Sequence, residues 1–293
     1  MEIFDPKDLK NLYYPAADSG GEDNGQVTII GGSSLFHGAP ILSLKTASRI
    51  VDMVFFSSPE SSIGKVAEKA KSKLLSFIWV AWEEVEAYIQ KSDSVLIGPG
   101  FMRFSKESQM EDSLLSNDDQ AARETKDITK RLLTKFREKR WVIDAGSLQV
   151  MDPEWIPTGA IITPNYKEFK LLFGEKVSEN GGKETEEIVK RKAQDYDCVI
   201  VLKGPETIVA SKNNCVIVRG GNAGMTKGGT GDVLAGLTVA LYAKNESFLA
   251  AASASYLAKA AADELFKDVG VSYNADDLAD KIPYTLKQMT NSF

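Results

Sequence analysis

Short runs of aliphatic and β-branched residues alternate along the chain with longer stretches of helical spacing. Six such runs cover residues 27–30, 53–56, 94–97, 141–144, 160–163 and 199–202. Runs of this length and composition are typical of buried strands. Strands that alternate with helices form a mostly parallel sheet with helices packed on it. The spacing therefore predicts an α/β fold.

Two further runs interrupt that alternation late in the chain. Residues 208–210 and 216–218 are rich in isoleucine and valine, and the polar residues 211–214 separate them. A short polar connection between two strand-like runs predicts an antiparallel hairpin. We therefore expect a late antiparallel hairpin in an otherwise parallel sheet.

Two segments stand apart from the strand and helix pattern. Residues 1–25 are poor in apolar side chains and end in a glycine-rich loop, which predicts an N-terminal arm. Residues 101–126 are polar and precede an expected helix at 128–139, so they predict a solvated insertion, a helix face or a mobile flap. Because 293 residues can bury one large core, we expect a single domain over 1–293 that includes both segments.

The composition restricts the class of partner. Hydrophobic residues make up 43% of the chain and charged residues 26%, as in globular proteins. A formal charge of −6 argues against general binding to nucleic acid or to an anionic membrane. No apolar run approaches the length of a membrane span, and the first residues do not resemble a signal peptide. We expect a cytoplasmic protein whose partners are small molecules.

Cysteine and histidine usage limits metal and disulfide chemistry. Cys198 and Cys215 lie in apolar runs, where burial as small side chains is a better interpretation than a disulfide. His37 is the only histidine, which excludes mechanisms or metal sites that need two. The sequence therefore assigns no metal ligand.

Residues 220–232 form a glycine-dense segment, with six glycines among thirteen positions. Glycine permits positive φ and a close approach to a ligand. The apolar run that begins after Asp232 predicts a buried helix there. The N–H groups of Gly229, Thr230 and Gly231 would then point at one position, where the helix dipole also favours a phosphoryl group. This pattern predicts a phosphate-binding cradle.

Asp232 stands beside that cradle, where its charge would repel a bound phosphate. In phosphoryl transfer a carboxylate can orient the attacking hydroxyl and accept its proton late. We therefore interpret Asp232 as a proton acceptor. The alternative is an ordinary acidic residue in the first turn of a helix, which the dipole favours without any ligand. The surrounding glycines favour the functional interpretation.

Loop signals follow several of the predicted strands, at residues 31–34, 98–100, 144–146, 163–165 and 203–204. In open parallel sheets the ligand lies beyond the carboxyl ends of the strands. We therefore expect these loops to converge on one crevice. For any single loop the alternative is that a strand must end in turn residues in any case.

Taken together, the motifs of residues 26–285 resemble the ADP/ATP-dependent NAD(P)H-hydrate dehydratases, a branch of the ribokinase-like fold. They are Gly31-Gly32-Ser33, His37-Gly38-Ala39-Pro40, Ile97-Gly98-Pro99-Gly100, Val142-Ile143-Asp144-Ala145, Thr163-Pro164-Asn165 with Glu168, Leu202-Lys203-Gly204, and the segment from Asn222 to Asp232. The Gly-Ala-Pro and Asn-Ala-Gly blocks separate this branch from sugar kinases. The resemblance implies a three-layer α/β/α sandwich.

The resemblance also implies an activity, which is the repair of hydrated NADH and NADPH. The added hydroxyl would be phosphorylated, phosphate would be expelled, and the nicotinamide double bond would be restored. ADP or ATP would donate the phosphoryl group, with Mg²⁺ bridging its oxygens. The implied assembly is a homotetramer.

Site residues carry over by position from the same resemblance. Asp232 would be the base on the hydrate hydroxyl, and Gly229, Thr230 and Gly231 would hold the transferring phosphate. Ala39, Gly100 and Asn165 would face the nicotinamide hydrate. The adenine nucleotide would contact Lys203, Gly204, Pro205, Glu206, Thr207, Asn222 and Gly231.

Two positions depart from the commoner pattern of that family. Asn165 stands where many members carry histidine, and its amide can still hydrogen-bond a substrate. Gly146 stands where a second acid often occurs, so no role of that acid carries over.

Two other functions would use the same cradle. A small-molecule kinase of this fold, acting on a hydroxymethylpyrimidine or a hydroxyethylthiazole, would use Asp232 in the same way. Such kinases lack the Gly38-Ala39-Pro40 loop and the Asn222-Ala223-Gly224 block, and their phosphorylated product accumulates. A non-catalytic nucleotide sensor would bind without turnover, and the carboxylate of Asp232 argues against it.

Overall fold

One large sheet organises the chain. The computed structural model describes residues 2–71, 74–104, 117–179 and 181–291. Within these residues the sheet has ten strands in the order β1-β10-β9-β8-β7-β6-β5-β2-β3-β4. Neighbouring strands are parallel except at β9, which runs antiparallel to both β8 and β10. The strands are β1 (Glu2–Ile3), β2 (Gln26–Ile30), β3 (Met53–Ser57), β4 (Ile78–Trp79), β5 (Ser94–Ile97), β6 (Arg140–Ile143), β7 (Ile161–Ile162), β8 (Val199–Leu202), β9 (Thr207–Ala210) and β10 (Cys215–Val218).

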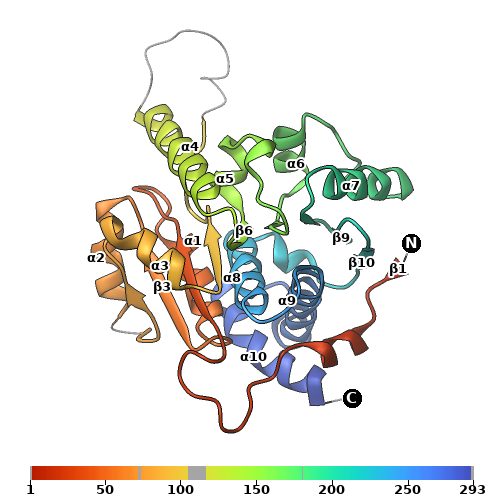
Figure 1. Cartoon of the computed structure of the whole chain (residues 1–293). Helices are drawn as coiled ribbons and strands as arrows, with labels where there is room; N and C mark the ends of the chain where they lie inside the picture. Colours follow the sequence, from red (N-terminus) through yellow and green to blue (C-terminus); the bar gives the residue numbers. More distant parts are fainter. Residues whose placement is uncertain (1, 72–73, 105–116, 180, 292–293) are drawn as a thin grey trace.

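The helices lie around this sheet, as Figure 1 shows. The α-helices are α1 (Gly38–Ala47), α2 (Ser61–Ala70), α3 (Val85–Lys91), α4 (Asn117–Lys135), α5 (Ala145–Val150), α6 (Tyr166–Phe173), α7 (Lys183–Asp195), α8 (Thr230–Tyr242), α9 (Ser247–Val269) and α10 (Ala275–Asn291). Short 3-10 helices are η1 (Pro6–Asn11), η2 (Trp82–Glu84), η3 (Pro153–Trp155) and η4 (Ala223–Thr226). Among the residues that the structure describes, no helix has both the length and the apolar character that a membrane span needs.

The sheet buries a separate hydrophobic cluster on each face. Val199 and Val201 of β8 belong to the cluster that includes α1, α8, α9 and α10. Ile200 and Leu202 of the same strand belong to the cluster that includes α3 to α7. Successive side chains of a strand point to opposite faces, so a strand covered on both sides must be apolar at every position. The continuous apolar runs in the sequence reflect this three-layer arrangement.

The strand pattern confirms the predicted α/β fold and its late hairpin. β5 and β8 have the expected bounds, β2, β3, β9 and β10 differ from them by one residue at one end, and β6 is shifted by one residue at both ends. β7 is shorter than predicted, at two residues. The hairpin of β9 and β10 pairs Ala210 with Cys215.

The N-terminal segment, which was expected to be an arm leading into the fold, contributes a strand to the sheet. β1 pairs in parallel with β10 and so forms one edge of the sheet. η1 follows, with Leu9 buried in the core. A strand of two residues carries too little pattern to be predicted, and the same holds for β4 at the opposite edge.

The prediction for residues 101–126 is partly wrong. A helix was expected from residue 128, but α4 already begins at Asn117. Its buried positions include Ala122, Thr125 and Thr129 before the apolar pair Leu132 and Leu133. Small and polar buried side chains give no apolar stripe, so the sequence leaves a solvated insertion, a helix face and a flap as alternatives, and from Asn117 the structure has a helix. The expected flap falls mainly on residues 105–116, which lie outside the described residues.

Candidate functional site

The loops after the parallel strands meet at one edge of the sheet, as predicted. The N–H of Gly32, after β2, donates to the carbonyl oxygen of Pro99, after β5, at 2.8 Å. After β6, the N–H of Gly146 donates to Gly98 O at 3.3 Å. After β8, the N–H of Lys203 donates to Pro164 O at 2.8 Å. Backbone-to-backbone contacts of this kind join the loops into one surface.

Glycine is required where these loops touch. At Gly98 φ is +118°, and a Cβ would lie 1.9 Å from the carbonyl oxygen of Asp144. At Gly100 φ is +76°, and a Cβ would lie 2.6 Å from Phe36 O. A residue with a side chain would be strained at both positions and would push the loops apart. Gly100 is thereby held against the turn that leads into α1, next to Pro40.

The glycine-dense segment forms the N-terminus of α8. Gly229 is the N-cap, with φ +95°, and α8 starts at Thr230. The helix therefore begins three residues before Val233, the residue at which the apolar run predicts its start. A Cβ on Gly229 would lie 2.5 Å from Leu42 of α1 and 2.8 Å from Ala275 of α10. The N-terminus of α8 therefore packs closely against α1 and α10. This close packing is possible because Gly229 has no Cβ.

The N–H groups of this first turn differ in their availability. Thr230 N–H points at Lys227 O at 3.5 Å, and the Thr230 hydroxyl is used within the turn, 2.7 Å from Met225 O and 3.0 Å from Lys227 O. Among the described residues no acceptor is found for the N–H of Gly231. An N–H left open at a helix N-terminus is an anion-binding group. The N–H of Gly229 likewise has no acceptor among the described residues, so the predicted cradle has open donors at Gly229 and Gly231, while the side chain of Thr230 stabilises the turn.

Asp232 lies in the first turn of α8. Burial, followed by the charge of Asp144, raises the pKa of Asp232 to about 7, although the ammonium of Lys203 acts in the opposite direction. A carboxyl group of this pKa is divided between its protonated and ionised forms near neutral pH. That is the condition that suits a general base.

Lys203 lies at the centre of the site, surrounded by carboxylates. Its Nζ is 2.8 Å from Oδ1 of Asp144 and 3.8 Å from Oε2 of Glu168. Burial lowers the pKa of Lys203, but Asp144 and Glu168 outweigh that effect, and the net pKa is raised. A Cβ built on Gly231 would lie 3.6 Å from this Nζ. The cation thus lies beside the open N–H donor of α8, where a phosphoryl group would find both.

The two carboxylates around Lys203 are themselves held by hydrogen bonds. The hydroxyl of Thr163 donates to Asp144 Oδ1 at 2.7 Å. The amide of Gln149 donates to Glu168 Oε1 at 2.9 Å, and the N–H of Asn165 donates to Glu168 Oε2 at 2.9 Å. Burial raises the pKa of Glu168, and Lys203 lowers it. Four ionisable groups, two of them directly after β6 and β8 and two in α6 and α8, therefore share one partly dry site.

The predicted substrate residues lie next to this charge cluster. Asn165 forms a parallel bridge with Lys203, and its Oδ1 caps α6 by accepting from Lys167 N and Glu168 N. The hydroxyl of Ser43 lies 2.8 Å from Asp232 O and 3.5 Å from Ala39 O, and so links Ala39 to the first turn of α8. Asn165 and Ala39 are therefore brought near Lys203 and Asp232, with the side-chain oxygen of Asn165 occupied by the helix cap.

Several residues that were predicted to contact the nucleotide form hydrogen bonds or ion pairs within the protein. Glu206 pairs with Arg219 at 2.8 Å, and the hydroxyl of Thr207 donates to Gly204 O at 3.4 Å. Asn222 uses its whole side chain inside the protein: Nδ2 donates to Ala262 O and Asp263 Oδ1, and Oδ1 accepts from Gly224 N and the Tyr273 hydroxyl. Asn222 therefore shapes its loop, and its side chain has no hydrogen-bonding capacity left for a ligand.

Asp144 and Glu168 were not assigned a role by sequence reasoning. Asp144 follows β6 directly, which is where parallel sheets place ligand-binding groups. Glu168 stands three residues after Asn165, which is the spacing of a capping box, and the structure contains that box. Both signals are present in the sequence, but neither says that the side chains meet Lys203. No cluster of three metal-ligating side chains occurs among the residues that the structure describes.

Gly146 has no room for a side chain. A Cβ on Gly146 would lie 2.4 Å from Phe101 O, so the absence of an acid here goes together with the path of the 98–101 loop.

Cys198 and Cys215 are free thiols, and burial raises the pKa of each to about 12. Neither thiol is available as a nucleophile near neutral pH.

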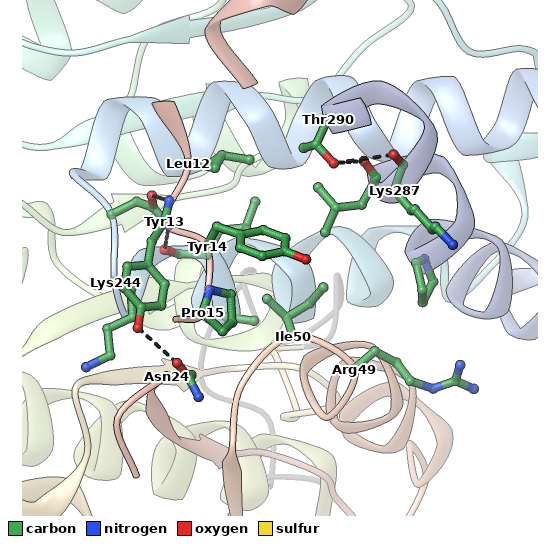
Figure 2. A pocket seen from close by; sticks show the side chains of 15 residues that line it. Leu12, Tyr13, Tyr14, Pro15, Asn24, Arg49, Ile50, Lys244, Lys287 and Thr290 are labelled. Carbon is green, nitrogen blue, oxygen red and sulfur yellow. Dashed lines mark hydrogen bonds between the residues drawn. The ribbon is translucent and has the colours of Figure 1, made fainter. Parts of the chain in front are cut away.

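A cavity of about 370 Å³ lies at the other end of α8. Figure 2 shows Tyr13, Tyr14, Ile50 and Lys244 around it. It also contacts Ala240 and Leu241, in the last turns of α8, whereas Asp232 lies in the first turn. The cavity is therefore separated from the predicted site by most of the length of that helix.

Comparison with known proteins points to one family. The family model described as NAD(P)H-hydrate dehydratase matches residues 27–284. The bifunctional NAD(P)H-hydrate repair enzyme Nnr of Methanocaldococcus jannaschii is 36% identical over 282 residues, covering 96% of this chain and 52% of the relative. The ADP-dependent (S)-NAD(P)H-hydrate dehydratase of Nitrosopumilus maritimus is 31% identical over 211 residues, covering 64% of this chain and 62% of the relative. The chain thus spans only about half to two thirds of these relatives.

Solved structures show the same fold. The ADP/ATP-dependent NAD(P)H-hydrate dehydratase of Bacillus subtilis, co-crystallised with ATP and Mg²⁺, has a TM-score of 0.77 at 22% identity, with 98% of each chain covered. A ribokinase-like protein of Enterococcus faecalis has a TM-score of 0.77 at 21% identity, covering 98% of this chain and 96% of that one. The sheet and helices of this chain therefore form a ribokinase-like fold. With the family model matched over residues 27–284, the chain belongs to the NAD(P)H-hydrate dehydratase family.

Proposed function

We propose that this protein converts NADH hydrate and NADPH hydrate back to NADH and NADPH, using ADP or ATP as phosphoryl donor. The observation that carries the proposal is the position of Asp232, a carboxyl group with its pKa raised to about 7, in the first turn of α8 beside Lys203. Phosphoryl transfer to a hydroxyl needs a base, a cation and an N–H donor close together, and this site has all three.

The reaction has two steps. In the first, Asp232 accepts the proton of the hydrate hydroxyl while that oxygen attacks the terminal phosphorus of the nucleotide, and the remaining nucleotide leaves. In the second, the C–O bond between the ring and the phosphorylated oxygen breaks, phosphate leaves with the electron pair, and the neighbouring ring carbon loses a proton. A carbon–carbon double bond is formed, and the dihydronicotinamide is restored. Phosphorylation serves this sequence because phosphate is a far better leaving group than hydroxide.

The remaining residues take supporting roles in this proposal. Gly229, Thr230 and Gly231 hold the transferring phosphate, and Lys203, whose Nζ lies beside Gly231, balances its charge. Residues 203–207 and Asn222 border the nucleotide, and Ala39, Gly100 and Asn165 border the hydrate. Mg²⁺ enters with the phosphates of the nucleotide, as part of that substrate. The charge cluster does not provide a metal cage, since Asp144 and Glu168 already face Lys203.

The experiment that tests the proposal separates a lyase from a kinase. The protein is incubated with NADH hydrate, Mg²⁺ and ADP or ATP, and inorganic phosphate and phosphate esters are measured over time. The proposal predicts one inorganic phosphate released per hydrate consumed, without a lasting phosphate ester. If the protein instead leaves the hydrate unchanged and phosphorylates hydroxyethylthiazole or a hydroxymethylpyrimidine, the protein is a vitamin-precursor kinase. A hydroxyethylthiazole kinase of Pyrococcus horikoshii shares the fold, with a TM-score of 0.59 at 18% identity.

We further propose that the protein is a cytoplasmic homotetramer. The homotetramer is what the resemblance of the motifs to this family implies, and the formal charge of −6 argues only against nucleic acid and anionic membranes as partners. Sedimentation equilibrium tests the assembly: a mass four times the 32.0 kDa of the chain supports it, and a monomer mass contradicts it.

A further inference from the structure

Lys259 of α9 places a buried ammonium group between two loops. The residue is 5% exposed. Its Nζ donates to Pro205 O at 2.6 Å, to Gly220 O at 3.0 Å and to Gly204 O at 3.3 Å. The first and third acceptors lie in the loop between β8 and β9, and the second lies just after β10. One ammonium group, with three donors, thus ties together two loops that are far apart in the sequence.

Asp263 continues the same connection one turn further along α9. Its Oδ2 accepts from the N–H of Gly221 at 2.9 Å, and its Oδ1 accepts from the side-chain amide of Asn222 at 3.1 Å. The held loop needs glycine, since φ is +100° at Gly220 and +77° at Gly221. A Cβ on Gly221 would also lie 2.7 Å from the sulfur of Met225. The loop therefore has little conformational freedom and lies against α9.

We propose that Lys259 and Asp263 are positioning residues that set the separation of the two loops between which the adenine nucleotide binds. The inference rests on the proposed function, in which residues 203–207 and Asn222 border the nucleotide. Neither Lys259 nor Asp263 needs to touch the nucleotide in this arrangement. Their side chains are fully used by the loops, and the gap between the loops is what they control. Binding sites depend on such supporting contacts, because small misplacements of the groups that contact a ligand weaken binding strongly.

The charge of Lys259 gives the connection a specific dependence on pH. Burial lowers the pKa of Lys259 to about 8, although Asp263 on its own helix and Glu206 on the facing loop raise it. A neutral amine has two N–H donors, whereas the ammonium has three. When Lys259 loses its proton, one of the three carbonyl groups loses its partner. The nucleotide site is therefore expected to loosen as pH rises through about 8.

The test compares Lys259→Met with a control on the same helix. Methionine keeps the length and packing of the side chain but removes all three donors. The control is Lys267→Met, because Lys267 is exposed and pairs only with Glu264 among the residues described. Isothermal titration calorimetry measures the dissociation constant of ADP from pH 6.5 to pH 9.5. Circular dichroism at each pH confirms that the variants are folded.

The expected result has two parts. At pH 7, Lys259→Met weakens ADP binding about tenfold or more, and Lys267→Met stays within about twofold of the original chain. The affinity of the original chain falls above pH 8, while that of Lys259→Met stays flat across the same range. In turnover assays the KM for the nucleotide rises in Lys259→Met, while kcat at saturating nucleotide changes less than about threefold. A purely structural lysine would not produce the flat pH profile.

A second variant covers the case in which Lys259→Met does not fold. Asp263→Asn preserves shape and one acceptor, and should weaken ADP binding about threefold or more while the KM for the hydrate stays unchanged. Equal ADP affinity in a folded variant and the original chain, at every pH, overturns the inference but leaves the proposed function standing. Failure of the original chain to bind ADP and ATP overturns both, because then the loops border no nucleotide.

Discussion

The Lys203 ammonium lies 2.8 Å from the Asp144 carboxylate, and this ion pair faces the residue that we propose as the base. Lys203 stabilises the ionised form of Asp232, and Asp144 destabilises it. The two partners of one ion pair therefore act on the base in opposite directions. Removing either partner should change the protonation of Asp232 in a direction that can be predicted.

Replacing the two partners one at a time should shift the pH dependence of activity in opposite directions. Lys203→Met leaves Asp144 and Glu168 uncompensated, which raises the pKa of Asp232, so the acid limb of the kcat/KM profile moves to higher pH. Asp144→Asn removes a charge that raises the same pKa, and the limb moves to lower pH. We expect shifts of about one pH unit. The measurement is kcat/KM for the hydrate from pH 5 to pH 9, and two shifts in the same direction would contradict this account.

The charge of Asp232 should cost stability at neutral pH. Its pKa is raised from 3.8 to about 7 in the folded chain. Between these values the folded state binds more protons than the unfolded state, so the free energy of unfolding falls as pH rises through that window. Asp232→Asn removes the effect and should be more stable than the original chain at pH 8, by an amount on the order of 1–4 kcal/mol. Urea unfolding at pH 5 and pH 8 checks this, since the difference between the chains should be smaller at pH 5.

Two neighbouring glycines should respond differently to alanine. At Gly231 a Cβ would meet only Lys203 Nζ, at 3.6 Å, and the helix would gain stability from alanine. If phosphate binds at the open N–H of Gly231, however, Gly231→Ala should weaken ADP binding about tenfold. At Gly229, with φ +95° and Leu42 at 2.5 Å, alanine should destabilise the fold by about 1–3 kcal/mol. Thermal unfolding and ADP titration measure both effects. A stable Gly231→Ala variant with unchanged ADP affinity would show that the phosphate lies elsewhere.

Gly146 should not accept an acidic side chain, or any side chain, without movement of its surroundings. Its Cβ would lie 2.4 Å from Phe101 O and 2.7 Å from Phe101 Cβ. Gly146→Ala should therefore destabilise the protein by about 1–3 kcal/mol, because the loop at residues 98–101 has to move. Chemical denaturation provides the measurement, with Gly38→Ala as control because a Cβ there meets nothing within 4 Å. Equal stability of the two variants would show that the loop moves freely.

The sequence predicts the sheet well because burial on both faces leaves a direct trace in composition. β8 is a continuous apolar run, and β5 is one apart from its first residue, Ser94. The edge strands β1 and β4 have two residues each, too few for any period to be recognised. The start of α8 was misplaced for a different reason: its first turn consists of Thr230, Gly231 and Asp232, which carry no apolar signal. The conformation of Gly229 sets that start.

The site was predicted in its location and only partly in its interactions. Glycine density and strand ends single out Gly231, Asp232 and Lys203, and the structure brings these residues close together. Which atoms pair is decided by three-dimensional contacts, and residue type alone does not reveal it. Asn222 was expected at the nucleotide, yet its side chain is fully bonded to α9, Gly224 and Tyr273. Lys259 gave no signal at all, because a single lysine in an alanine-rich helix is usually exposed.

The most direct test of the central claim is to follow the absorption band of reduced nicotinamide while NADH hydrate is mixed with the protein, Mg²⁺ and ADP or ATP. Only dehydration regenerates that band. The account predicts recovery that requires a nucleotide and falls at least about a hundredfold in Asp232→Asn, while that variant still binds ADP. No recovery by a folded, nucleotide-binding protein, or near-normal recovery with Asp232→Asn, would contradict it.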